Sequence, residues 1–519
     1  MKYSILKPFI WSLLTGALLA ISQTTRAQTL PATQTDPKTS EAPTATVFGT
    51  PYVPAGVPTP PPLNKKDYQI FGTIRLREED WNWFPSTKGN GNYTFLGGYA
   101  RVGVSRATRT DDMVLEFSAP FLAGLPSTAT APAPLGAMGL GANYYAANHQ
   151  HVADFFLKNG YVRFKNAGTP NTSVRLGRFE YSDGVEIVSA DPSLNWIKQN
   201  RIGQRLLGPF GFSDVGRSFD GIQITNSKPT RHLTAAFMMP TRGVYDLNGW
   251  DTLVDNRIFY AAGTIPHTGS HSSSEGRLFA LYYEDVRNGA VVKTDNRPAA
   301  ARALDKSSIS YATFGGNYER VQKLGKGKVD GMFWGAGQIG RWGTLRQGAF
   351  AFAAEAGYQP NLPLKPWLRF GYDYYSGDGN NANGIHGTFI SPAPTPRNFA
   401  RTPFFTESNL KDLFGEIILR PNTRVNLRAD VHGLQLADSH DLWYSGGGAY
   451  DIRNFGYAGR TSSGHSNLGT LYDVSLDYQA RRDLTLSLYF GYVKGGDVVT
   501  SIYRGSDLTY AYAESTFHF

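Results

Sequence analysis

Apolar and polar residues alternate along most of this 519-residue chain, in segments of roughly ten residues separated by turn residues. In the first such segment Ile70, Ile74 and Leu76 fall on one face, whereas Arg75 and Arg77 fall on the other. Successive side chains of a β-strand point to opposite faces, so this period of two predicts a strand with one apolar and one polar face.

Segments of this kind recur along the chain about eighteen times, an even number as is usual for single-chain bacterial barrels. They cover residues 68–79, 93–106, 112–119, 153–165, 172–180, 217–226, 231–240, 256–265, 275–286, 307–321, 328–340, 346–358, 365–376, 411–420, 424–436, 468–480, 484–494 and 507–519. The pattern predicts an all-β fold, a transmembrane antiparallel β-barrel that occupies residues 68–519.

The connections between the predicted strands support the same fold. Those after every second strand are short, for example 107–111 and 421–423. Most of the others are long, for example 120–152, 181–216 and 377–410. Outer-membrane barrels have short periplasmic turns and longer extracellular loops, so this order of lengths places both ends of the barrel chain in the periplasm.

The polar face of the strands carries the candidate functional residues. An arginine on the lipid face near the middle of the bilayer costs about 2–4 kcal/mol, so these arginines are expected in the lumen. Rings of arginine select anions, because guanidinium groups lower the barrier for carboxylates and bind them bidentately. The predicted substrate pathway consists of Arg75, Arg77, Arg101, Arg175, Arg178, Arg369, Asp373, Arg428 and Asp430.

The sequence leaves alternatives open for this pathway. Arginine and carboxylate side chains in a lumen also stabilise a barrel wall, so each arginine is either structural or selective. Arg178 follows Arg175 by three residues, and strict alternation points it outward unless a bulge at Gly177 turns it inward. The basic 181–216 loop either folds into the mouth or lies in solvent, and the Ala- and Gly-rich 120–152 loop is either a pliable plug or surface disorder.

The N-terminal residues are predicted to lie outside the barrel. Residues 1–27 have the features of a secretory signal peptide: Lys2 and Lys7, a short apolar run, and the small-residue cleavage site 25–27. Residues 28–67 are rich in Pro, Thr and Ala and show no periodic apolar face, so they are expected to form a disordered periplasmic leader. No later apolar run is long enough for a transmembrane helix.

Composition and charge agree with an exported barrel. The formal net charge is +9, and the predicted signal peptide carries three basic residues and no acid, which leaves +6 for the mature chain. Export argues against nucleic acid as a partner, and we expect outer-membrane lipid and an anionic solute instead. The 29 Tyr, 31 Phe and 9 Trp, in a chain of mean hydropathy −0.32, fit strands with aromatic girdles at both membrane interfaces.

No sequence pattern for catalysis or for a cofactor stands out. The chain has no cysteine and no His-Glu-x-x-His, P-loop or Gly-x-Ser-x-Gly motif. His267 and His271 fall in a Ser/Gly turn and are interpreted as solvated rather than as metal ligands. We therefore expect no cofactor, no metal site and no enzymatic activity, although a hydrolase site built from separate strands would leave no motif.

The chain ends on an aromatic residue. Alternation along the last predicted strand places Phe517 and Phe519 on the outer face. A terminal aromatic residue on such a strand resembles the sorting signal that outer-membrane insertion machinery reads, so this machinery is an expected partner.

Several short motifs resemble those of the alginate export family of outer-membrane channels. They are Ile-Arg-Leu-Arg-Glu at 74–78, Val-Arg-Leu-Gly-Arg-Phe-Glu at 174–180, Arg-Ser-Phe-Asp-Gly at 217–221, Tyr-Ser-Gly-Asp at 375–378 with Thr-Phe at 388–389, and Leu-Gly-Thr-Leu-Tyr-Asp at 468–473. The resemblance implies an eighteen-stranded monomeric channel in a Gram-negative outer membrane, whose arginine-rich lumen passes an anionic polyuronate outward and whose loops fold in as a gate. Phe179 departs from the polar glutamine that the family often has there.

These observations favour a passive outer-membrane channel for anionic oligo- or polysaccharides, alginate-like, or for other anionic solutes. The alternative is a structural or adhesive barrel with a plugged lumen, whose long loops act outside the cell. A membrane-embedded barrel enzyme is the third possibility.

Overall fold

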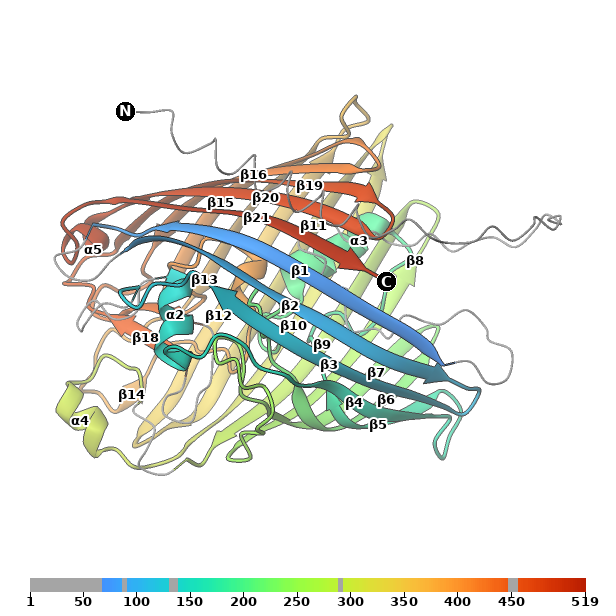
Figure 1. The fold of residues 1–519 in the computed structure, drawn as a ribbon, viewed down its shortest axis with the longest axis horizontal. Coiled ribbons are helices and arrows are strands. Elements are labelled where there is room, and N and C mark those ends of the chain that lie inside the picture. The colour runs from blue at the N-terminus through green and yellow to red at the C-terminus, as the bar shows by residue number, and fades with distance from the viewer. Residues whose placement is uncertain (1–67, 86–90, 130–138, 288–292, 447–455) are drawn as a thin grey trace. The chain divides into compact units, whose positions relative to one another are not determined.

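The computed structural model describes residues 68–85, 91–129, 139–287, 293–446 and 456–519, and these residues form a closed 18-strand antiparallel β-barrel (Figure 1). This confirms the predicted fold class and the predicted number of strands. The expected signal peptide and leader, residues 1–67, lie outside the described residues.

Each barrel strand pairs with its neighbours in the chain. The wall consists of β1 (Gln69–Asn82), β2 (Asn92–Ala107), β3 (Asp111–Ala123), β4 (Phe156–Lys165), β5 (Thr172–Phe179), β6 (Phe219–Lys228), β7 (Arg231–Pro240), β8 (Asn256–Thr268), β9 (Ser272–Asp285), β10 (Ile309–Leu324), β11 (Gly327–Trp342), β12 (Leu345–Gln359), β13 (Trp367–Tyr375), β15 (Leu410–Asn422), β16 (Val425–Gln435), β19 (Asn467–Arg481), β20 (Leu484–Gly495) and β21 (Asp507–His518).

The remaining elements lie in the connections between barrel strands. They are α2 (Gly139–Asn148), α3 (Pro192–Ile197), the π-helix η1 (Lys198–Ile202), α4 (Ala299–Leu304), the 3-10 helix η2 (Pro396–Asn398), α5 (Asp497–Thr500), and the short strands β14 (Ile385–His386), β17 (Trp443–Gly446) and β18 (Tyr457–Arg460). None of the helices in the described part of the chain is long and apolar enough to cross a membrane.

The two ends of the barrel differ in their connections, as predicted. The turn end carries short links such as 229–230 and 325–326. The loop end carries most of the long ones, including 124–155, 180–218 and 376–409. The link between β11 and β12 is the short exception at the loop end. In outer-membrane barrels the turn end faces the periplasm.

The barrel closes where β21 pairs with β1, and Figure 1 shows these strands side by side with the C-terminus at the end of β21. Phe519 extends the ladder, since its carbonyl accepts from the Gly72 N–H (2.9 Å) and its N–H donates to the Gly72 carbonyl (3.1 Å). Lipid offers no hydrogen bonds to the backbone, so only a closed ladder leaves no edge of unpaired groups.

Side chains alternate between the two surfaces of the wall as the sequence predicts. The apolar faces point outward: Val102, Phe370 and Val431 are 50%, 59% and 46% exposed in the isolated chain. The charged faces point inward, where Arg369 and Asp430 are buried. The observed pairing register of the strands therefore places apolar side chains toward lipid and charged side chains toward the lumen.

We predict that the ion pair across the closing seam stabilises the barrel. Arg77 and Glu514 face each other in register, both are buried, and their charged groups lie 2.6 Å apart. Glu514→Gln leaves a buried guanidinium poorly compensated and should lower the free energy of unfolding by about 3–5 kcal/mol. Urea unfolding in lipid vesicles measures the loss.

The matched control breaks an exposed pair on the adjoining strands. Lys494 and Asp507 lie 3.0 Å apart and are both more than half exposed, so Asp507→Asn should change stability by less than about 1 kcal/mol. Equal losses in the two variants would contradict a special role for the seam pair.

Candidate functional site

The 180–218 loop folds into the lumen rather than lying in solvent. Its helix α3 begins after Asp191, whose carboxylate accepts hydrogen bonds from the Ser193 N–H (2.8 Å) and the Leu194 N–H (3.2 Å), with Pro192 in the first turn. Most apolar side chains of this loop are buried, and Leu207 has no exposed surface. This settles the alternative left open for the basic loop.

Ion pairs tie the 180–218 loop to opposite sides of the wall. Its partners belong to β1, β9, β12 and β13, which are spread around the closed ring of strands. The pairs are Lys198–Glu275 (2.7 Å), Arg201–Glu355 (2.7 Å), Arg205–Asp373 (2.9 Å) and Asp214–Arg75 (2.9 Å). A segment with partners on opposite walls must cross the interior, so this loop divides the lumen.

The 376–409 loop also enters the lumen. The Ile390 carbonyl accepts hydrogen bonds from the Tyr311 hydroxyl on β10 (2.8 Å) and from the Gln338 amide on β11 (2.8 Å). On the other side of the barrel, Arg401 donates to the Tyr512 hydroxyl on β21 (3.0 Å). The 376–409 loop therefore crosses the interior as well.

The two inward loops are bonded to each other through their backbones. The Ala393 N–H donates to the Leu206 carbonyl (2.9 Å), and the Gly208 N–H donates to the Ala393 carbonyl (2.7 Å). The Thr395 N–H adds a third bond, to the Gln204 carbonyl (3.0 Å). The loops thus form one body inside the barrel, which we call the inner plug (residues 180–218 and 376–409).

All predicted pathway residues except Arg178 lie on the lumen face, and all of these except Arg175 are held by opposite charge. Besides the Arg75 and Asp373 pairs with the plug, the contacts are Arg77–Glu514 (2.6 Å), Arg101–Glu180 (3.4 Å), Arg369–Glu355 (2.8 Å), Arg428–Glu416 (2.6 Å) and Arg428–Asp430 (2.8 Å). Their charges are compensated inside the barrel, so these residues anchor the wall and the inner plug.

Arg178 lies apart from the other predicted residues. The pairing of β5 continues through Gly177 without a register shift, although that glycine has a φ of 122°. Alternation is unbroken, so Arg178 stays on the outer face, where it forms a bidentate pair with Asp220 (2.7 and 2.8 Å). Its guanidinium also donates to the Trp250 carbonyl (2.7 Å), which attaches the 241–255 loop to the rim.

Arg175 is the predicted residue with an uncompensated charge. It lines a cavity of about 330 Å³ between strands β4–β7 and the start of the 180–218 loop. The guanidinium carbon lies 4.0 Å from the centre of the Phe179 ring, and within the described residues Arg175 has no ion-pair partner.

The carboxylates that line this cavity are engaged elsewhere. Glu180 lies 3.2 Å from the Lys158 ammonium group, and Glu186 lies 2.9 Å from the Arg277 guanidinium. The charge of Arg175 is therefore not neutralised within the cavity, which is the arrangement expected for binding a carboxylate.

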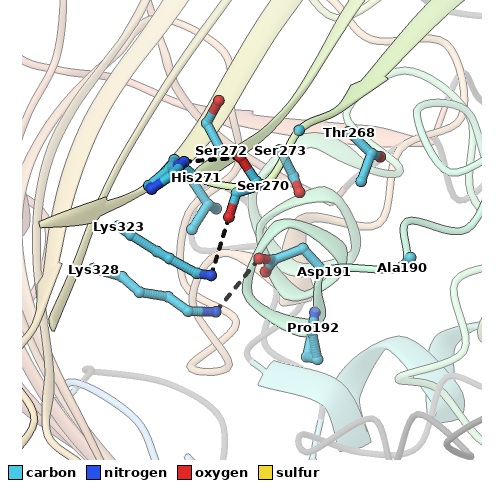
Figure 2. A pocket seen from close by; sticks show the side chains of 12 residues that line it. Ala190, Asp191, Pro192, Thr268, Ser270, His271, Ser272, Ser273, Lys323 and Lys328 are labelled. Carbon is cyan, nitrogen blue, oxygen red and sulfur yellow. Dashed lines mark hydrogen bonds and ion pairs between the residues drawn. The ribbon is translucent and has the colours of Figure 1, made fainter. Parts of the chain in front are cut away.

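A second hollow, of about 230 Å³, opens at the turn end (Figure 2). Lys323 and Lys328 point into it from β10 and β11, and the β8–β9 turn with its exposed His271 forms another side. Lys323 donates to the Ser270 carbonyl (3.0 Å), and Lys328 lies 3.4 Å from Asp191. Two ammonium groups against one carboxylate make this mouth basic.

Alternation along the last strand predicts Glu514 on the inner face, and the structure buries it there. Sequence reasoning missed Glu355 and Glu416, although they share the inward face with the arginines and strand alternation was sufficient to place them. It also missed that the 376–409 loop turns inward, because no local pattern specifies which distant strands a loop will contact. The ion pairs of Asp214 and Arg205 were missed for the same reason, since their partners lie on the distant strands β1 and β13.

Comparison with known families agrees with this geometry. The model of the family described as alginate export matches residues 143–511, which is more than half of the chain. The chain belongs to the alginate export family. Among curated proteins no relative matches it in sequence.

Solved structures with the same fold are distant in sequence from this member of the alginate export family. Pseudomonas aeruginosa OccK9 (OpdG) superposes with a TM-score of 0.55 at 11% identity, over 87% of this chain and 98% of that one. Acinetobacter baumannii OccAB1 gives 0.51 at 11% identity, over 87% and 96%. Family and fold identify an outer-membrane β-barrel channel of a Gram-negative bacterium, and such channels are generally not enzymes.

We predict that Glu355 holds the inner plug in place. This carboxylate on β12 lies between Arg201 of the plug (2.7 Å) and Arg369 of the wall (2.8 Å). Glu355→Gln removes the charge that holds both, so the plug should loosen and the single-channel conductance in planar bilayers should rise. Glu319→Gln is the control, because that buried lumen residue hydrogen-bonds to Asn317 of its own strand. Equal conductance in wild type and Glu355→Gln would reject this role.

We also predict that the plug loosens as pH rises. Burial raises the pKa of Glu407, in the 376–409 loop, to about 7, against the opposing effect of Arg397. A raised pKa means that the folded loop favours the neutral acid. The stabilisation is full below the ordinary pKa near 4.5 and is lost as pH rises through about 7.

Current fluctuations should therefore be rarer at pH 5 than at pH 8 in planar bilayers. Glu407→Gln keeps the neutral form at every pH and should remove the difference. Asp251→Asn, in an exposed loop, should leave it unchanged. A Glu407→Gln channel with the pH response of wild type would refute the assignment.

Proposed function

We propose that this barrel is a passive channel for anionic oligo- or polysaccharides, of the polyuronate class, or for smaller anionic solutes. Arg175 is the residue that selects them. The remaining predicted arginines support the pathway by shaping the wall and holding the inner plug.

The observation that carries this proposal is the uncompensated charge of Arg175 in a cavity. Arg175 is half-buried, and a partly desolvated charge without a counter-ion is unfavourable. A carboxylate from solution would relieve it by charge-assisted hydrogen bonds. The Phe179 ring beneath the guanidinium fixes its orientation, since the cation lies over the face of the ring. The departure from the family's usual glutamine at this position thus supports the same site.

Both basic hollows lie toward the turn end. Arg175 is the fourth residue of β5, which begins at the turn end, and Lys323 and Lys328 lie beside the β10–β11 turn. An anion that approaches from the periplasm would meet the two lysines and then Arg175, which fits solute capture for export. We further propose that the channel works as a monomer and that insertion machinery reads the terminal Phe519.

A plugged structural or adhesive barrel is the second candidate, and the inner plug favours it. In the described residues the two inward loops bond to each other and to opposite walls. Absence of solute flux and of channel openings in proteoliposomes would favour this second function.

We predict that Arg175→Gln weakens anion selectivity. A hydrogen bond to a charged group contributes about 1.5–3 kcal/mol, so block of the channel by uronate oligosaccharides should weaken by roughly tenfold or more. The reversal potential under a salt gradient should shift toward zero. Both are measured in planar bilayers.

Arg178→Gln is the matched control, since it removes the same charge from the same strand but on the outer face. It should leave selectivity and block unchanged. The proposal fails if the two variants behave alike, or if the wild-type pore prefers cations.

A further inference from the structure

Three carboxylates lie side by side across neighbouring strands of the lumen wall. Glu416 on β15 faces Asp430 on β16, and Asp430 faces Asp473 on β19, all in register and all inward. They are at most 9% exposed. Like charges directly opposite each other in a sheet are destabilising, so this row requires positive charge.

Arg428 supplies positive charge to only part of the row. Its Nε lies 2.6 Å from Glu416 and 2.8 Å from Asp430. Asp473 has no ion-pair partner in the part of the chain that the structure describes, and it accepts a hydrogen bond from the Tyr489 hydroxyl (3.1 Å). One Asp430 oxygen, Oδ1, is buried without a hydrogen-bond partner. The positive charge of Arg428 therefore reaches Glu416 and Asp430 and leaves Asp473 without an ion pair.

His432 lies beside this row, two residues after Asp430 on the same face of β16. It is 1% exposed. Its Nδ1 bonds to the Asp412 carboxylate (2.9 Å), whereas its Nε2 is buried without a partner. Metal-binding histidines commonly have this carboxylate partner on their other ring nitrogen, which fixes the tautomer and orients the ring.

We propose that Asp430, His432 and Asp473 bind a divalent transition-metal ion, with Asp412 as the positioning residue for the imidazole. One ligand atom from each of the three residues lies within 4.8 Å of the others. Bonds of about 2.0–2.2 Å to a shared ion would draw these atoms closer together. Two carboxylates neutralise the ion, and water in the lumen completes its coordination.

The donor set favours zinc over calcium or magnesium. Imidazole nitrogen suits Zn²⁺ and its neighbours in the first transition series, whereas Ca²⁺ and Mg²⁺ prefer sites made of oxygen alone. This site links β16 to β19 and is independent of Arg175, which lies on β5.

Zinc binding to the intact barrel tests the proposal. The mature protein is prepared in detergent without a polyhistidine tag, stripped with EDTA and titrated with ZnCl₂ by calorimetry, with bound zinc counted by elemental analysis. Wild type should retain one equivalent of zinc more than His432→Gln and Asp473→Asn. Asp412→Asn should keep the stoichiometry and weaken the affinity about 10–100-fold.

His232→Gln is the matched control. His232 is also a buried lumen histidine with an unpartnered Nε2, but the metal-ligand group found among the described residues does not include it. Its zinc content should equal that of wild type. Heat-modifiability on gels shows which variants fold. If His432→Gln does not fold, the zinc content of Asp473→Asn decides the test. Equal zinc in wild type and the folded site variants, or loss of zinc in His232→Gln, overturns the proposal.

Discussion

The structure depends on the need of every backbone N–H and C=O group in the membrane to find a partner within the protein. A sheet of eighteen strands meets it only by closing, and the ladder between β1 and β21 completes the ring. Closure creates two surfaces of opposite character, because each strand sends alternate side chains to lipid and to the lumen. The lumen surface receives the charged side chains, and the candidate binding sites of this protein therefore lie there.

Charges gathered in a lumen must be compensated there, and this explains the inner plug. Wall carboxylates such as Glu275 and Asp373 meet Lys198 and Arg205 of the plug, whereas Arg75 of the wall meets Asp214. The pairs run in both directions, because basic groups of the plug meet wall carboxylates and a carboxylate of the plug meets a wall arginine. The same contacts that stabilise the barrel therefore position the loops that narrow it.

Two of the places that depart from this compensation carry proposals. Arg175 is a cation whose neighbouring carboxylates are engaged by other basic groups. Asp473 is a carboxylate at the end of a row whose arginine serves the first two members. One site lacks an anion and the other lacks a cation. An anionic solute and a divalent metal ion are the species that would complete them.

The sequence by itself determined the barrel, its strand number, the inward placement of Arg369 and Asp430 and the outward placement of Phe370. These properties depend on a period of two and on local turn residues, which are written along each segment. Only the tertiary structure decided that Arg175 stays without an ion pair, that Arg178 remains on the outer face, and that residues 376–409 turn inward. Asp214 and Arg75 are far apart in the chain, as are Arg205 and Asp373, and their pairing results from closure of the ring and folding of the loops. No local pattern records such contacts, because each depends on where distant strands come to lie.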